Sequence, residues 1–140
     1  MTSPFCHSVG AVIKNSKGEY LMLYRLVKPI GLAMPAGHVE SGEEPGDAIR
    51  REVLEETGIR VINMTRRWEQ IVSVGCSRGI LTHIWHVFEV KSYQGEPELK
   101  EPRKHKFVRF MSPDEIHQYA ARKDFDPSWS RFILKDLGIL

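Results

Sequence analysis

A short stretch of the 140-residue chain concentrates carboxylates at spacings that a helix would gather onto one face. Glu52, Glu55 and Glu56 fall within an arc of about 100° on a helix, and Arg51 stands beside them. Glu52 and Glu56 form a like-charge pair one turn apart, which costs roughly a few tenths of a kcal/mol. Glu55 and Glu56 also lie in the last turn before Gly58, where the helix dipole disfavours anions by roughly 0.3–1 kcal/mol. This crowding predicts a bound cation, and the plain alternative is a solvated acidic helix face.

The helix that must position these carboxylates has recognisable ends. Ser41 with Glu44 fits a capping box, whereas the proline after Glu44 places the cap equally well at Glu44 itself. Gly58 suits the left-handed position that closes a helix. Ile49 and Val53 lie four residues apart beside the acidic arc, so we expect them to anchor the helix on a sheet.

The rest of the chain is typical of a β-rich unit with flanking helices. A turn signal at 15–18 separates two apolar strands and predicts a hairpin. A polar loop at 92–102 precedes a short strand and a helix that begins with a capping box at Ser112. A last helix follows Pro127 and ends at Gly138. The predicted strands are 5–13, 20–26, 59–61, 68–74, 80–90 and 107–110.

The composition indicates one ordinary globular domain over residues 1–140, with 41% hydrophobic and 27% charged residues. A net charge of +2 is too small to indicate a nucleic-acid or anionic membrane partner. No apolar run approaches the ~20 residues that span a bilayer. The start, MTSPFCHSVG, lacks the regions of a signal peptide, so a cytoplasmic location is expected. Cys6 and Cys76 stand in unrelated contexts and indicate neither a disulfide framework nor a zinc site.

The acidic stretch also fits a family pattern. The pattern G-x(5)-E-x(7)-R-E-U-x-E-E-x-G-U, with U an aliphatic residue, is the Nudix box, and by it the chain resembles the Nudix hydrolases. Ala36 departs from the glycine pair often seen at the entrance of the box, and Phe110 stands where the family often has tryptophan. The box positions are met by Gly37, Glu43, Arg51, Glu52, Val53, Glu55, Glu56, Gly58 and Ile59.

The resemblance implies a fold of the α/β (α+β) class, an α/β/α sandwich with a mixed sheet. It also implies metal-dependent hydrolysis of the pyrophosphate linkage of a nucleoside diphosphate joined to another group. Carboxylate-rich sites suit hard cations, so Mg²⁺ is expected, with Mn²⁺ as the alternative. Such an ion neutralises a pyrophosphate and orients water.

The resemblance assigns roles to the residues of the box. Glu52, Glu55 and Glu56 are implied to be the metal ligands, together with the backbone carbonyl of Gly37. Glu52 is also the commoner choice for activating the attacking water. Glu43 and Arg51 are implied to brace the loop against the helix, or else to form a surface ion pair.

Several other side chains carry weaker signals. One of Glu96, Glu98 and Glu101 in the later loop is a candidate further ligand or base, although polar loops are commonly acidic. His38 is either a phosphate contact or an exposed turn residue. His83 and His86 read as packed histidines rather than metal ligands. Trp68, Trp85 and Tyr24 are candidates for stacking on a nucleobase, but core packing is the commoner role of aromatic residues in strands.

The sequence indicates the substrate less clearly than it indicates the reaction. The compact length resembles that of the MutT-like nucleoside triphosphate pyrophosphohydrolases, which favours conversion of a triphosphate to a monophosphate and pyrophosphate. The alternatives are an ADP-ribose or nucleotide-sugar hydrolase and a non-catalytic nucleotide-binding module. Residues 74–76 show neither the proline nor the tyrosine that marks some Nudix subgroups. Residues 66–68 give a small basic and aromatic cluster for an RNA end, a less favoured partner. The oligomeric state is open, and a homodimer is compatible with the sequence.

Overall fold

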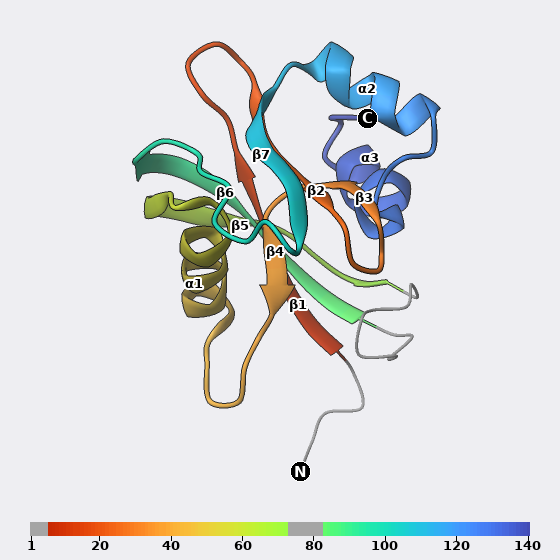
Figure 1. The fold of residues 1–140 in the computed structure, drawn as a ribbon. Coiled ribbons are helices and arrows are strands. Elements are labelled where there is room, and N and C mark those ends of the chain that lie inside the picture. The colour runs from red at the N-terminus through yellow and green to blue at the C-terminus, as the bar shows by residue number, and fades with distance from the viewer. Residues whose placement is uncertain (1–5, 73–82) are drawn as a thin grey trace.

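The computed structural model describes residues 6–72 and 83–140, and its strands form two sheets (Figure 1). The larger sheet has the strand order β4-β1-β6-β5 and is mixed. Its central strands β1 and β6 are parallel, while β4 and β5 pair antiparallel with their neighbours. The bounds are β1 Cys6–Ile13, β4 Ala36–His38, β5 Arg60–Val72 and β6 His83–Gln94.

The smaller sheet is antiparallel and has the order β3-β2-β7. Its strands are β2 Tyr20–Arg25, β3 Gly31–Ala33 and β7 His105–Met111. The helices are α1 Pro45–Thr57, α2 Pro113–Ala121, the π-helical turn η1 Ser128–Ile133 and the short α3 Leu134–Asp136.

Figure 1 shows α1 on one side of the strands and α2 and α3 on the other. The alternation of side chains along β1 explains these layers, because successive residues of a strand face opposite sides of a sheet. Val9 and Ala11 pack with Ile49 and Val53 of α1, whereas Val12 belongs to the cluster formed with the C-terminal helices. The predicted sandwich with a mixed sheet and the predicted anchoring of α1 are therefore confirmed.

The predicted hairpin between the first two strands is wrong. The turn at 15–18 is present, but the strands diverge beyond a bridge between Lys14 and Tyr20. β1 enters the centre of the larger sheet and β2 the centre of the smaller one. The reason is that β1 is apolar on both faces and is buried between two strands and two layers of side chains.

The other strand predictions hold in part. The predicted strand 59–61 and the described part of the predicted strand 68–74 belong to one strand, β5, which spans Arg60–Val72 and whose pairing with β6 shifts register at three places. The middle of β5 has a polar sequence that is typical of a loop, because β5 is an exposed edge strand. The strand predicted at 80–90 continues to Gln94, and the one at 107–110 begins at His105. Predictions on residues 1–5 and 73–82, among them Cys76 and the positions at 74–76, lie outside the described residues.

The helix ends follow local signals closely. Glu44 is the N-cap of α1, so the alternative at Ser41 is wrong, and Gly58 closes the helix with φ 77°. Ser112 and Glu115 form both bonds of the predicted capping box of α2. In the described residues, no helix is long and apolar enough to cross a membrane.

Candidate active site

The C-terminal half of α1 packs against β4, and this contact depends on a glycine. A Cβ atom added at Gly37 would lie only 2.1 Å from the Cδ atom of Glu52. Any larger residue would therefore push the Glu52 carboxylate away from the strand. The structure thus places two of the predicted site positions, Gly37 and Glu52, in direct contact.

Arg51 ties the loop before α1 to the carboxylates on the helix. Its Nε and Nη2 atoms donate to the two carboxylate oxygens of Glu43 at 2.8 and 3.0 Å. Its Nη1 atom donates to Glu52 at 2.8 Å and lies 3.4 Å from Glu55, and Nη2 also donates to the carbonyl of His38 at 3.1 Å. These bonds lower the pKa of Glu43 to about 2 and raise that of Arg51. A guanidinium is suited to this role because its fork of donors is rigid.

Glu52 and Glu56 share a poorly solvated environment. Burial, and next the neighbouring charge of Glu56, raise the pKa of Glu52 to about 7, although Arg51 opposes this rise. Burial also raises the pKa of Glu56, against the stabilising effect of His105. Glu55 differs, since its side chain is 53% exposed. Two neighbouring carboxylates are thus drawn out of water, which is a costly arrangement unless a further positive charge joins them.

The later loop contributes one of its three glutamates to this cluster. Ligand atoms of Glu56, Glu101 and His105 all lie within 4.8 Å of one another. Glu98 instead lies over the end of α1, where its backbone N–H donates to the carbonyl of Thr57 at 2.8 Å. Among the three predicted candidates, the geometry singles out Glu101.

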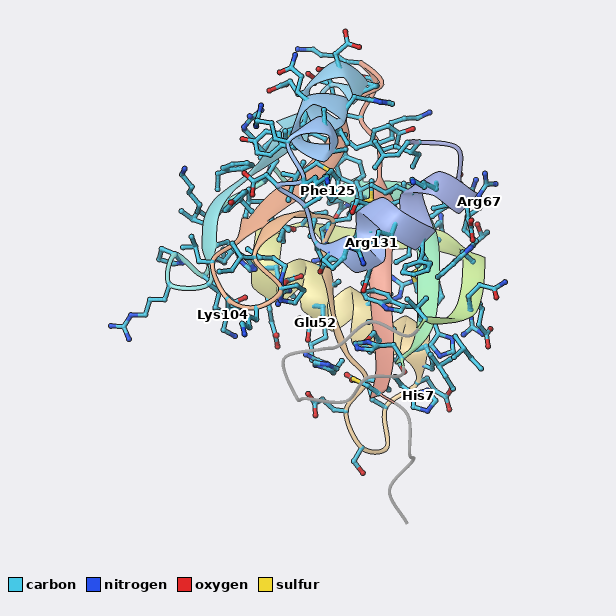
Figure 2. The ribbon with its side chains drawn as sticks, turned by 90° about the vertical axis from the view of Figure 1, so that its right-hand side faces the viewer. His7, Glu52, Arg67, Lys104, Phe125 and Arg131 are labelled. Atoms are coloured by element: carbon cyan, nitrogen blue, oxygen red, sulfur yellow. The ribbon has the colours of Figure 1, made fainter. Side chains whose placement is uncertain are left out.

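A cleft of about 400 Å³ opens over these carboxylates and is shared by α1, β4 and the β6–β7 loop. Glu52 and Lys104, both labelled in Figure 2, line it, together with Arg25 and Val27. A smaller hollow of about 50 Å³ adjoins it, since Arg25, Ala36, Gly37 and His38 line both.

The smaller hollow is lined by polar groups that are otherwise buried. Asp126 is 5% exposed, accepts a hydrogen bond from the Ser128 N–H at 2.9 Å, and has its pKa raised to about 6 by burial. Ser8 and His83 face the same hollow and lie 3.1 Å apart between Oγ and Nδ1. Such convergent polar groups beside a reactive centre can recognise a ligand's hydrogen-bonding edge.

The weaker sequence candidates have mixed outcomes. His86 is packed in the sheet, 7% exposed, and Trp85 is buried against Trp129. The hydroxyl of Tyr24 donates to the side chain of Asp124 at 2.6 Å, and Tyr24 lines neither the larger cleft nor the smaller hollow. Trp68 donates to Asp136 at 3.0 Å.

The basic cluster at 66–68 has partners within the chain. Arg66 pairs with Glu69 at 3.0 Å and Arg67 with Glu89 at 3.4 Å. Each of the two arginines thus has an acidic partner at the surface.

No sequence pattern selects Arg25, His105 or Asp126 as site residues. Each lies near the carboxylates only because the two sheets and the C-terminal segment meet there. Arg25 and His105 are isolated polar residues at strand ends and Asp126 is one between a β-bridge and a helical turn, so no spacing or local signal identifies these three.

Comparisons with known proteins identify the family of the chain. Residues 4–133 match the NUDIX domain family. The chain is 30% identical to the RNA pyrophosphohydrolase of Bartonella bacilliformis over 59% of its own length, and 30% identical to the ADP-ribose pyrophosphatase of Bacillus subtilis over 74%. The matches cover 54% and 56% of those relatives, so the chain spans about half the length of each. The crystal structure of the MutT NUDIX hydrolase from Burkholderia pseudomallei superposes with a TM-score of 0.69 at 25% identity, covering 78% of this chain and 84% of that one.

Proposed function

Because this chain belongs to the Nudix family, we propose that it is a metal-dependent hydrolase that cleaves the pyrophosphate linkage of a nucleotide. The observation that carries the proposal is the concentration of buried negative charge under the larger cleft. Glu52 and Glu56 are partly or fully withdrawn from water, and Arg51 is committed to Glu43 as well as to Glu52.

The donor set fits a divalent cation. Oxygen donors from Glu52, Glu55, Glu56 and Glu101 line one cleft with the backbone of Gly37. Hard ions such as Mg²⁺ or Mn²⁺ prefer such ligands. When bound, the ion would neutralise the pyrophosphate and stabilise the charge that develops on the oxygens around phosphorus.

The protein groups then have separate tasks. Attack by water forms a new phosphorus–oxygen bond while the anhydride bond breaks, and the proton of the water must leave. Glu52 suits the acceptor role, since burial raises its pKa to about 7, close to neutral pH. Arg51 holds Glu52 in place and Glu43 holds Arg51, so both act on orientation rather than on the substrate.

The adjoining hollow supports a nucleotide as the substrate. Asp126, Ser8 and His83 line this hollow, which shares Gly37 with the larger cleft, whereas Glu55 lines only the larger cleft. We favour a nucleoside triphosphate, cleaved to a monophosphate and pyrophosphate. ADP-ribose is the second candidate, because the relative from Bacillus subtilis is named an ADP-ribose pyrophosphatase. A 5′-triphosphate RNA is the third, because the relative from Bartonella bacilliformis is named an RNA pyrophosphohydrolase.

A product analysis distinguishes these candidates. The chain is incubated with Mg²⁺ and nucleoside triphosphates, ADP-ribose, a nucleotide sugar or 5′-triphosphate RNA, and the products are separated by chromatography. We expect pyrophosphate and a nucleoside monophosphate from a triphosphate. Two monophosphates from ADP-ribose alone would replace the favoured substrate with the second candidate.

Matched variants connect turnover to the site. E56Q removes the charge of the buried glutamate and should abolish turnover. E98Q removes a charge from the same later loop outside the cluster and should leave it unchanged. Nucleotide binding without turnover of any substrate would instead identify a non-catalytic nucleotide-binding module.

A further inference from the structure

His105 lies against the most buried carboxylate of the site, although it is outside the Nudix box. It is the first residue of β7 and is only 3% exposed. Its Nε2 atom lies 3.4 Å from Oε2 of Glu56. The other oxygen of Glu56 accepts the backbone N–H of Ala36 at 2.9 Å. The two oxygens of this carboxylate are therefore held from two different strands.

The backbone around His105 fixes the position of its ring. The carbonyl of Glu101 accepts the N–H groups of Lys104 and His105 at 2.9 and 3.0 Å, which closes a tight turn. The carbonyl of Lys104 in turn accepts the N–H of Leu26 at 2.8 Å, at the end of β2. The turn brings the Glu101 carboxylate and the imidazole to the same side of Glu56.

The surroundings of the ring also indicate where its proton lies. Nδ1 is buried and has no hydrogen-bond partner in the part of the chain that the structure describes. A buried N–H without an acceptor is costly, so of the two imidazole tautomers the one with its proton on Nε2 is favoured. In that form the only N–H of the ring is on the side of Glu56.

We propose that His105 is a positioning residue, which holds the Glu56 carboxylate in the orientation needed to bind the divalent cation. The inference rests on the proposed function, since it takes Glu56 as a metal ligand. Partners that orient a metal ligand in this way commonly contribute about 10–100-fold to metal affinity.

The test measures Mn²⁺ binding directly, by the electron paramagnetic resonance signal of free Mn²⁺, without substrate. H105L removes the donor, whereas H105Q retains an N–H group near the position of Nε2. We expect H105L to raise the Kd for Mn²⁺ at least about tenfold, and H105Q to stay within about threefold of the wild type. H105N, whose amide is too short to reach Glu56, should resemble H105L and replaces it if H105L does not fold.

A second histidine provides the control. His86 is also buried in a strand, and its ring nitrogens have no hydrogen-bond partner among the described residues. H86L should leave the Kd unchanged, which separates metal positioning from a general effect of replacing a packed histidine. In turnover, H105L should need about tenfold more metal for half activation, while its kcat at saturating metal stays within about threefold.

Two outcomes overturn the inference while leaving the proposed function intact. One is wild-type Mn²⁺ affinity in both H105L and H105N. The other is equal weakening in H105Q and H105L, which would show that the donated N–H is not what matters. If the wild type and E56Q instead bind Mn²⁺ equally poorly, the proposed metal centre itself fails, and this inference fails with it.

Discussion

Replacing Gly37 by alanine is the most direct test of the contact between β4 and α1. The new Cβ would stand 2.1 Å from Cδ of Glu52, whereas ordinary contact begins at 3.4 Å, so the carboxyl must move by about 1.3 Å. A displacement of ~1 Å at a catalytic group can cost about 100-fold in rate. We therefore expect G37A to lower kcat about 100-fold. Overpacking of this kind also costs about 1–3 kcal/mol in the free energy of unfolding.

The assay compares pyrophosphate release at saturating metal with urea denaturation of the same preparations. G46A is the matched control, because a Cβ at Gly46 would meet only the end of the flexible Met64 side chain at 3.3 Å. Alanine is also preferred to glycine in a helix, so G46A should be active and somewhat more stable. A G37A protein with more than about a tenth of wild-type kcat would refute the argument that this contact sets the position of Glu52.

Three further predictions concern the carboxylates and their arginine. E55Q and E56Q should each lower kcat by orders of magnitude while nucleotide binding is partly retained, as measured by single-turnover kinetics and equilibrium titration. R51K should lower the free energy of unfolding by about 1–2 kcal/mol in urea, because an ammonium cannot replace the fork that binds Glu43 and Glu52; an unchanged midpoint would contradict this. Because the folded-state pKa of Glu43 is lowered from 4.5 to about 2, its stabilising effect is present above pH 4.5 and is lost as the pH falls towards 2. E43Q should thus show a shallower loss of stability over that pH range, and an identical pH dependence would count against the contact with Arg51.

Features governed by neighbours in sequence could be predicted well. The capping box at Ser112 and the left-handed Gly58 depend only on residues within a helical turn, and both are as expected. The acidic arc on α1 is likewise a property of one helix. The contact of Arg51 with Glu43 agrees with the bracing expected from the family pattern, although its effect on activity stays a prediction.

Features that depend on distant partners could not be predicted. The turn at 15–18 shows where the chain reverses, but not that β1 would prefer β6 to β2 as its partner. The polar residues in the middle of β5 do not indicate a strand, because an edge strand needs no regular alternation of apolar residues. Among the loop glutamates, only tertiary packing distinguishes Glu101 from Glu98. His105 and Asp126 join the site for the same reason.

The parallel pairing of β1 with β6 has a consequence for the order in which the molecule folds. Ile13 pairs with Val90, so closing this ladder requires two segments that are remote in sequence to meet. Such pairings form slowly, because the chain loses the conformational entropy of a long loop before the stabilising contacts form. The bonds among Glu43, Arg51 and Glu52 are local and can form with α1. Glu101 and His105 follow β6 in the sequence, so their approach to Glu56 also requires the closure of a long loop. Tight metal binding should therefore be among the last properties that a refolding chain acquires.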